Sequence, residues 1–327
     1  MMESPLVSIA VITYNQEKTL PKTLDSLLAQ KVDFPIEIVV GEDCSTDHTR
    51  EVLKGYANRY PDVIKPIYNE TNLGILGNYM MTLSHCQGKY MAGCAGDDFW
   101  SDSEKLQMQV DIMENDPSIG LVYTDVVMDS VATNQRFERG CADPREDLFT
   151  QLLEGCFITA PTACYRRDLL QHVDFEEFHK QGFAMEDYPM WLTFSLHTRF
   201  YHLKRPTVTY RIERGFINDA KAVSLHACKF DENTTAIRLY FLNKYPDKTR
   251  LTESEILDAH NKIGYLAGLN MNDREFALRY VSRMHRRTPY VKRLTTICKS
   301  PLLFGMYQLY RDLMGKKRSP LEMYFGQ

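Results

Sequence analysis

Two adjacent carboxylates follow one of the apolar runs of the chain. Asp97 and Asp98 follow residues 89–94 after Ala95 and Gly96, and the apolar Phe99 and Trp100 come next. Neighbouring carboxylates repel each other. A hard cation such as Mg²⁺ or Mn²⁺, held by one or two protein carboxylates and phosphate oxygens, relieves that repulsion. A solvated acidic turn is the alternative, although the two aromatic residues argue against full solvation. The pair therefore indicates a metal site.

Two other acidic segments suit nucleotide binding or proton transfer. Asp43 follows the apolar run 36–40, where a carboxylate can accept the N3–H of uracil, a donor that cytosine lacks. Asp187 stands after Glu186 at the start of a helical pattern. That position suits a general base, and it also suits helix capping. The residues alone do not choose between these two roles.

Asparagines mark a third kind of segment. Asn72 and Asn78 lie where a loop enters an expected helix. The N-terminus of that helix could face an anionic ligand. A plain turn explains the same residues equally well.

The elements that must position these residues alternate between strand and helix. Expected strands are 6–13, 36–40, 63–68, 89–94 and 120–128, and expected helices are 17–30, 46–60, 75–86 and 103–115. Apolar, β-branched runs such as 6–13 are typical of buried parallel strands. We therefore predict an α/β fold, with a mostly parallel sheet flanked by helices. Ligands of such sheets lie beyond the carboxyl ends of the strands.

The second half of the chain loses this alternation. A helix is expected at 187–196 and a strand at 207–211, whereas 133–185 has no clear pattern. From about residue 220 the patterns are helical, at 230–243, 253–270 and 274–285. We therefore predict a catalytic domain over 1–219 and a C-terminal helical region over 220–327.

Charge is unevenly distributed along the chain. The 327 residues carry a formal net charge of -4, which does not favour nucleic acid as a partner. Residues 283–318 hold ten Lys or Arg and one acid, a net of +9. Within that basic segment, apolar residues recur at helical spacing: Leu302, Met306, Leu309, Tyr310 and Leu313. Such a helix could lie on an anionic membrane surface, or it could pack on the catalytic domain.

Several common classes of protein are not indicated. The chain has no G-x-G-x-x-G after its first expected strand, no P-loop sequence and no G-x-S-x-G. No apolar run approaches the roughly 20 residues that span a bilayer. No signal peptide is apparent, so we expect a cytoplasmic protein that is peripheral at most.

Five segments, taken in order, resemble the family 2 glycosyltransferases, which have the A-type glycosyltransferase fold. They are VSIAVITYN (7–15), VGEDCSTDHT (40–49), NLGILGN (72–78), GDDFW (96–100) and EDYPMWL (186–192). The resemblance covers roughly residues 5–215. It implies an enzyme of the type that builds bacterial surface polysaccharides.

The resemblance also implies roles for single residues. Asp43 resembles the acid that holds the nucleotide base, Asp97 lies near the ribose, and Asp98 binds the metal. Asp187 resembles the catalytic base. Further residues expected to bind the nucleotide-sugar are Thr13, Tyr14, Asn15, Asn72, Asn78 and Arg211. The chain departs from the family pattern at Glu42, where aspartate is commoner, and at Glu213, near which members often carry a histidine.

The implied reaction is an inverting, single displacement. Asp187 takes the proton of an acceptor hydroxyl on a glycan or lipid-linked glycan, while Mn²⁺ or Mg²⁺ neutralises the diphosphate of a nucleotide-sugar, expected to be a UDP-sugar. One alternative is a sugar nucleotidyltransferase, which would need a Gly-rich, Arg-containing loop where this chain has TYNQE at 13–17. Another is a non-catalytic glycan-binding module.

Overall fold

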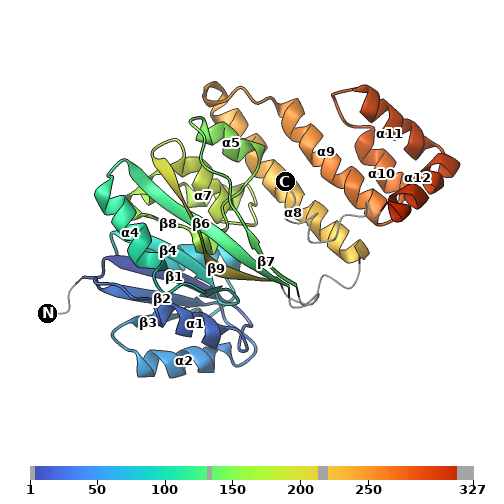
Figure 1. The fold of residues 1–327 in the computed structure, drawn as a ribbon. Coiled ribbons are helices and arrows are strands. Elements are labelled where there is room, and N and C mark those ends of the chain that lie inside the picture. The colour runs from blue at the N-terminus through green and yellow to red at the C-terminus, as the bar shows by residue number, and fades with distance from the viewer. Residues whose placement is uncertain (1–3, 131–134, 213–219, 315–327) are drawn as a thin grey trace. The chain divides into compact units, whose positions relative to one another are not determined.

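The computed structural model of the protein describes residues 4–130, 135–212 and 220–314 (Figure 1). The chain divides into two compact units. The first comprises Met1–Leu152 and Cys156–Ile212, and the second comprises Leu153–Gly155 and Glu213–Gln327. Glu213, where the sequence departs from the family pattern, lies outside the described residues.

The described strands of the first unit form one nine-stranded sheet, in the order β3-β2-β1-β4-β8-β6-β9-β5, with β7 paired to β6. The strands are β1 (Val7–Thr13), β2 (Ile36–Glu42), β3 (Ile64–Tyr68), β4 (Tyr90–Ala95), β5 (Phe99–Trp100), β6 (Ile119–Ser130), β7 (Gln135–Arg139), β8 (Cys164–Arg166) and β9 (Arg199–Ile212). Strands β1 to β4 are parallel, as is the long β6–β9 pair, and antiparallel β8 joins the two groups.

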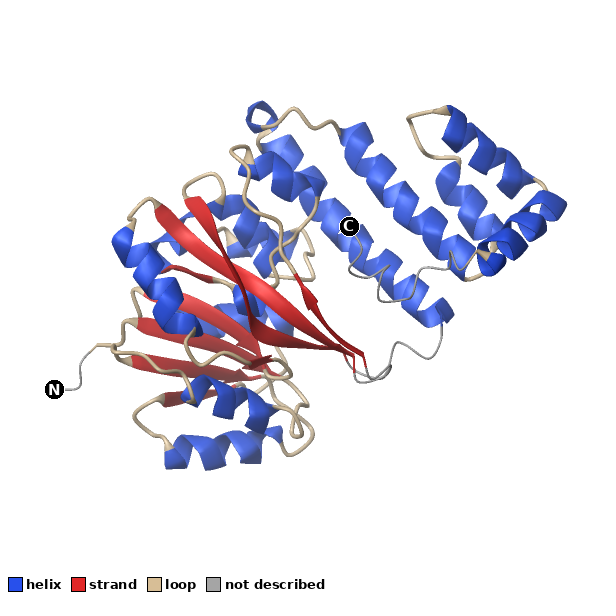
Figure 2. Cartoon of the chain, viewed as in Figure 1, coloured by secondary structure: helices blue, strands red, loops and turns tan. Residues whose placement is uncertain are grey.

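Helices flank this sheet (Figure 2). They are α1 (Leu20–Leu28), α2 (Thr49–Arg59), α3 (Gly74–Ser84), α4 (Lys105–Asn115), α5 (Leu148–Glu154), α6 (Phe175–Lys180) and α7 (Asp187–Phe194), with 3-10 turns at Ala160–Thr162 and Arg167–His172. Helix α1 begins three residues later than expected, and Pro21 stands in its first turn, where a missing N–H costs nothing. The predicted α/β class is confirmed.

Sheet pairing extends two strands beyond their sequence patterns. Strand β2 continues to Glu42 because its neighbours Thr13 and Tyr68 are still in register there. Strand β9 begins at Arg199, eight residues before the expected strand, because it pairs with β6 along most of that strand's length. Tertiary pairing therefore overrides the weak local pattern of β9.

The register of the central strands brings three loops to one edge of the sheet. Strand β1 lies between β2 and β4, with Thr13 opposite Glu42 and Ile12 opposite Ala95. The first loop residues are tied to β1: the Asp43 N–H donates to Thr13 O at 3.0 Å, and the Gly96 N–H donates to Ile12 O at 3.0 Å. The segments that begin at Tyr14, Asp43 and Gly96 therefore leave the sheet side by side.

The second unit is helical in its described part. Its helices are α8 (Ala220–Lys244), α9 (Glu253–Asn270), α10 (Arg274–Val281), α11 (Pro289–Lys299) and α12 (Pro301–Leu313), with a 3-10 turn at Pro246–Lys248. Side-chain caps start α10, α11 and α12, where Asp273, Thr288 and Ser300 each accept a backbone N–H three residues on. Throughout the described residues, we find no helix with both the length and the apolar character to cross a membrane.

Candidate active site

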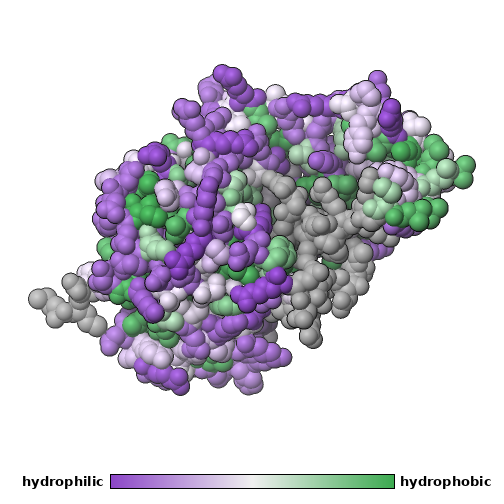
Figure 3. Space-filling view, in the orientation of Figure 1, coloured by the Kyte–Doolittle hydropathy of each residue, from purple (hydrophilic) through white to green (hydrophobic). Residues whose placement is uncertain are grey.

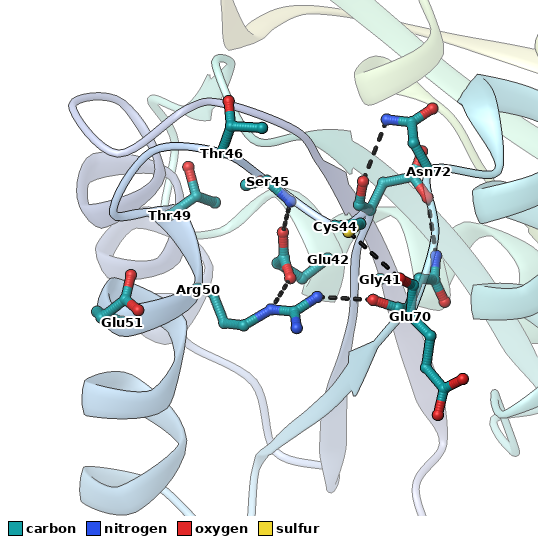
Figure 4. A network of polar contacts seen from close by, with 12 residues as sticks. Gly41, Glu42, Cys44, Ser45, Thr46, Thr49, Arg50, Glu51, Glu70 and Asn72 are labelled. Atoms are coloured by element: carbon teal, nitrogen blue, oxygen red, sulfur yellow. Dashed lines mark hydrogen bonds and ion pairs between the residues drawn. The ribbon is translucent and has the colours of Figure 1, made fainter.

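The loop after β2 is held together by a buried ion pair (Figure 4). Glu42 is fully buried, and its carboxylate accepts the Ser45 N–H at 2.6 Å and pairs with the Arg50 guanidinium. Arg50 also donates to Asn69 O at 2.7 Å. Glutamate in place of aspartate can therefore bridge from the end of the strand to helix α2. Sequence patterns do not identify Arg50 as a partner of Glu42, because the two residues lie eight positions apart on different elements.

Asp43 links this loop to the start of α3. Its Oδ1 accepts the Leu73 N–H at 2.8 Å and the Asn69 side-chain amide at 2.9 Å, and its Oδ2 accepts the Gly74 N–H at 3.0 Å. The side chain is 3% exposed. A carboxylate has about four lone-pair sites, so Oδ2 keeps one for a further donor. The observed contacts are those of a helix-capping anion, and the contact with a base stays a prediction.

The two asparagines have different surroundings. Asn78 is 2% exposed; its amide donates to Gly41 O at 2.9 Å and accepts from Asn69 at 3.0 Å. A Cβ on Gly41 would come within 2.4 Å of Asn78 Oδ1, so this approach requires glycine. Asn72 is exposed and donates to Asp43 O at 3.1 Å. Asn78 thus stabilises the end of β2 through its bond to Gly41. Binding of the nucleotide-sugar by Asn72 and Asn78 stays a prediction.

The residues after β1 pack against the same loop. Asn15 Oδ1 accepts the Thr46 N–H at 2.8 Å, while its own N–H donates to Ser45 Oγ at 3.0 Å. Asn15 and Cys44 have positive φ angles of 53° and 59°, a conformation that is uncommon outside glycine and gathers at functional sites. Tyr14 is 45% exposed beside them. The structure thus brings the predicted Tyr14–Asn15 edge to the Asp43 loop.

The Asp97–Asp98 turn lies next to β1 at the same edge. Its close approach depends on Gly96, where a Cβ would lie 2.7 Å from Thr13 Oγ1. Asp98 is 3% exposed, and its Oδ1 accepts the Arg211 N–H at 3.0 Å. Burial and then the neighbouring Asp97 carboxylate raise the pKa of Asp98 well above its ordinary value. The folded chain therefore leaves this carboxylate short of positive charge.

A group of cations lies beside this turn. Lys22 Nζ lies 3.5 Å from the centre of the Phe99 ring, and the Arg211 guanidinium lies 5.8 Å from the same centre. Asp129 is in register with Arg136 on β7 and with Arg211 on β9, so the three form a cross-strand row. Burial and then Arg211 lower the pKa of Lys22, while Asp129 raises it. The sequence pattern identified Arg211 and missed Lys22 and Arg136, because Lys22 reaches Phe99 from helix α1 and Arg136 meets Arg211 through sheet register.

Glu186 and Asp187 form a coupled pair at the N-terminus of α7. Burial and then Asp187 raise the pKa of Glu186 to about 8. Burial also raises the pKa of Asp187, to about 6, against the opposing hydrogen bond that its carboxylate accepts from the Tyr188 N–H at 2.8 Å. Two adjacent carboxylates disfavour each other's ionisation. Because the pKa of Glu186 is raised further than that of Asp187, the pair favours the state in which Glu186 is protonated and Asp187 is ionised.

No group of three His, Cys, Asp or Glu side chains able to hold a metal occurs among the residues that the structure describes. The Asp97–Asp98 pair nevertheless suits Mg²⁺ or Mn²⁺. Mg²⁺ typically takes one or two protein carboxylates and completes its shell with phosphate oxygens and water. The raised pKa of the buried Asp98 fits the same chemistry, since a bound cation would remove its repulsion from Asp97.

A model of Glycosyl transferase family 2 matches residues 8–174, slightly more than half of the chain. The chain belongs to this family, and the resemblance identified from its five segments is confirmed. The matched range includes the loops after β1, β2 and β4.

Two bacterial proteins are similar to this chain in sequence. It is 36% identical over 164 residues to Rv1520 of Mycobacterium tuberculosis, which covers 49% of this chain and 47% of that protein. It is 29% identical over 252 residues to WfgD of Escherichia coli, and the match covers 75% of this chain and 93% of WfgD. WfgD is named a UDP-Glc:alpha-D-GlcNAc-diphosphoundecaprenol beta-1,3-glucosyltransferase. The chain thus spans about half the length of Rv1520.

Solved structures share the fold. S. aureus TarS 1-349 in complex with UDP-GlcNAc has a TM-score of 0.51 at 18% identity, covering 90% of this chain and 91% of that one. The mannosyltransferase PcManGT from Pyrobaculum calidifontis, in complex with GDP-Man and Mn²⁺, has a TM-score of 0.56 at 16% identity, covering 98% and 86%. The predicted A-type glycosyltransferase fold is confirmed.

Proposed function

We propose that this chain is an inverting, metal-dependent glycosyltransferase that moves a sugar from a UDP-sugar to a hydroxyl of a glycan or lipid-linked glycan. The observation that carries the proposal is the meeting of the Tyr14, Asp43 and Asp97–Asp98 loops at one sheet edge. Residues 1–219 form the catalytic domain in this proposal, and 220–327 form the helical region.

The nucleotide lies against the loops after β1 and β2. The remaining lone pair of Asp43 Oδ2 accepts uracil N3–H, and the exposed ring of Tyr14 offers a face for stacking. Thr13, Asn15, Asn72 and Asn78 hold the surrounding backbone or line this edge. The UDP-GlcNAc bound to TarS supports the choice of donor.

Asp98 holds the metal ion, and Asp97 lies at the ribose. A bound Mg²⁺ or Mn²⁺ neutralises the diphosphate as it becomes the leaving group. The Mn²⁺ bound to PcManGT supports this proposal. Lys22 and Arg211 both lie over the Phe99 ring, and their cationic groups can donate hydrogen bonds to the same diphosphate.

Asp187 is the general base. With the proton held on Glu186, Asp187 is ionised at neutral pH and accepts the proton of the acceptor hydroxyl. The hydroxyl oxygen forms a bond to the anomeric carbon as the bond from that carbon to the diphosphate oxygen breaks. A single displacement of this kind inverts the anomeric centre.

The acceptor is a glycan carried on a lipid in cell-surface polysaccharide assembly. The name of WfgD, whose match covers three quarters of this chain, includes a diphosphoundecaprenol-linked sugar. In this proposal the enzyme works on the cytoplasmic side of the membrane that holds the lipid.

Release of UDP from a panel of UDP-sugars, with Mg²⁺ or with EDTA, tests the proposal. We expect slow, metal-dependent hydrolysis of at least one donor in the absence of acceptor. Synthesis of a nucleotide-sugar from a nucleoside triphosphate would instead indicate a nucleotidyltransferase. Glycan binding without either reaction would indicate a binding module.

A further inference from the structure

Helix α12 packs on the second unit through a mixed face, in which Phe304 joins an apolar cluster and Gln308 and Arg311 make hydrogen bonds. Gln308 donates to Leu269 O at 2.6 Å, and Arg311 donates to Asn270 Oδ1 at 2.8 Å. Both side chains are buried, as is Phe304. These contacts fix the rotation of the helix about its own axis, because they join its inner face to the end of α9.

The outer face of α12 is apolar. Its exposed residues are Leu302 (73%), Leu303 (40%), Met306 (61%), Leu309 (62%), Tyr310 (46%), Leu313 (78%) and Met314 (56%). Leu302, Met306, Leu309 and Leu313 follow the spacing of one helical stripe. Figure 3 shows apolar groups gathered over α12. A helix of a water-soluble protein normally buries such a stripe against its core, whereas this stripe is exposed.

Basic side chains accompany this apolar face. Residues 283–314 carry seven Lys or Arg and one acid, a net of +6, and Arg311 alone among the seven is buried. Lys292, Arg293 and Lys299 are exposed on α11, the neighbouring helix in sequence. Tyr290, at the start of α11, is 65% exposed. Tyrosine favours the boundary between lipid and water, where its ring and its hydroxyl can both be satisfied.

We infer that the outer face of α12 is a docking surface for an anionic lipid bilayer. This inference rests on the proposed function, in which the acceptor is held on a membrane lipid. The 13-residue helix is about 20 Å long, which suits a helix lying in the interface rather than crossing it. The leucine and methionine side chains enter the acyl boundary, and the nearby cations face the anionic headgroups.

Charge favours a bilayer over a second copy of the chain. A symmetric dimer through this face would bring two like-charged segments together, each with exposed Lys292, Arg293 and Lys299 on α11. An anionic bilayer supplies both the apolar phase and the opposite charge. Residues 315–318 add three more cations to the sequence, although their structure lies outside the described residues.

Flotation of the full chain with vesicles tests the inference. We expect binding to phosphatidylglycerol-containing vesicles at low salt, weaker binding at high salt, and little binding to phosphatidylcholine alone. The double variant Leu302→Asp with Leu309→Asp should bind at least about tenfold more weakly, because two apolar side chains no longer enter the lipid. Its matched control is Leu225→Asp with Phe230→Asp on α8, both 44% exposed, which adds the same charge and should weaken binding much less.

A second pair of variants tests the charge. Reversing Lys292, Arg293 and Lys299 to Glu should weaken binding at low salt by at least about tenfold. Reversing the exposed Lys31, Arg59 and Lys180 gives the same change in net charge away from α12, and should weaken binding much less. Circular dichroism confirms that each variant is folded.

Three outcomes would overturn the inference. The first is recovery of full-length protein only in the unbound fraction with phosphatidylglycerol vesicles at low salt. The second is a dimer in light scattering that Leu302→Asp with Leu309→Asp converts to a monomer, which assigns the face to a second copy. The third is vesicle binding only after deletion of 315–327, which assigns the face to that segment. Release of UDP from soluble donor is measured separately, so loss of vesicle binding with intact UDP release leaves the proposed function standing.

Discussion

Two sets of acids at the same sheet edge have opposite surroundings. Glu42 and Asp43, after β2, receive their partners from the chain itself: Arg50 and the Ser45 N–H for the first, and the Leu73, Gly74 and Asn69 donors for the second. Asp98, after β4, is equally buried, and that burial together with the adjacent Asp97 carboxylate raises its pKa. Glu42 and Asp43 therefore stabilise the loops. Asp98 instead marks the place where a bound cation would supply the missing positive charge.

The largest effect is expected at Asp98. Asp98→Asn keeps the shape of the side chain and removes its charge, so it should lower transfer by about 10³-fold and abolish the dependence of UDP binding on Mg²⁺. Thermal shifts with UDP, with and without Mg²⁺, measure the second effect directly. A variant that keeps full activity in excess EDTA would show that Asp98 belongs to the framework.

Asp187→Asn should lower transfer by about 10²-fold or more while leaving UDP binding unchanged, because only proton transfer is lost. Wild-type transfer should also decline as pH falls below about 6, where Asp187 takes up a proton. The measurement is initial rates against pH, beside the Kd of UDP. Normal transfer by the variant would reduce Asp187 to a helix cap.

Arg50→Leu tests the framework acids. It leaves the fully buried Glu42 without its cation, so we expect a loss of about 3 kcal/mol in the free energy of unfolding. The turnover of the molecules that remain folded should change by less than about tenfold. Denaturant titration and active-site counting separate the two quantities. A large loss of turnover with unchanged stability would move Arg50 into the group that binds substrate.

Glu186→Gln should have the smallest effect on transfer, because the amide resembles the protonated carboxyl, and its effect is seen in how stability varies with pH. The pKa of Glu186 is 4.5 in the unfolded chain and about 8 in the folded protein. Between these two pH values the unfolded chain ionises Glu186, while the folded protein keeps the proton on it. Wild-type stability therefore falls as pH rises through that window. The variant lacks this decline, so its stability relative to wild type should be higher at about pH 8 than at about pH 5. Urea denaturation of both proteins at the two pH values measures this. An equal difference in stability between variant and wild type at both pH values would refute the raised pKa of Glu186.

The sequence predicted the fold class and the positions of the acidic loops, because buried parallel strands have a strong local pattern and ligands lie beyond their carboxyl ends. It could not predict which acids were already satisfied. Arg50 reaches Glu42 from another element, and Arg136 meets Arg211 only through the register of β6.

Helix α12 shows the same limit in another form. The sequence shows the apolar stripe of this helix, and it allows two roles for the helix: lying on a membrane surface or packing on the catalytic domain. The direction it faces was set by Gln308 and Arg311, whose partners lie on α9 and could not be identified from spacing alone.

The most direct measurement is the count of protons released when UDP and Mg²⁺ bind. Calorimetric titration in buffers of different ionisation enthalpy gives that number. Since the pKa of Asp98 is raised in the free protein and a carboxylate must be ionised to hold the metal, we predict that binding releases protons and that this release disappears in Asp98→Asn. Binding with no proton release, or with equal release by the variant, would contradict the assignment of Asp98 to the metal.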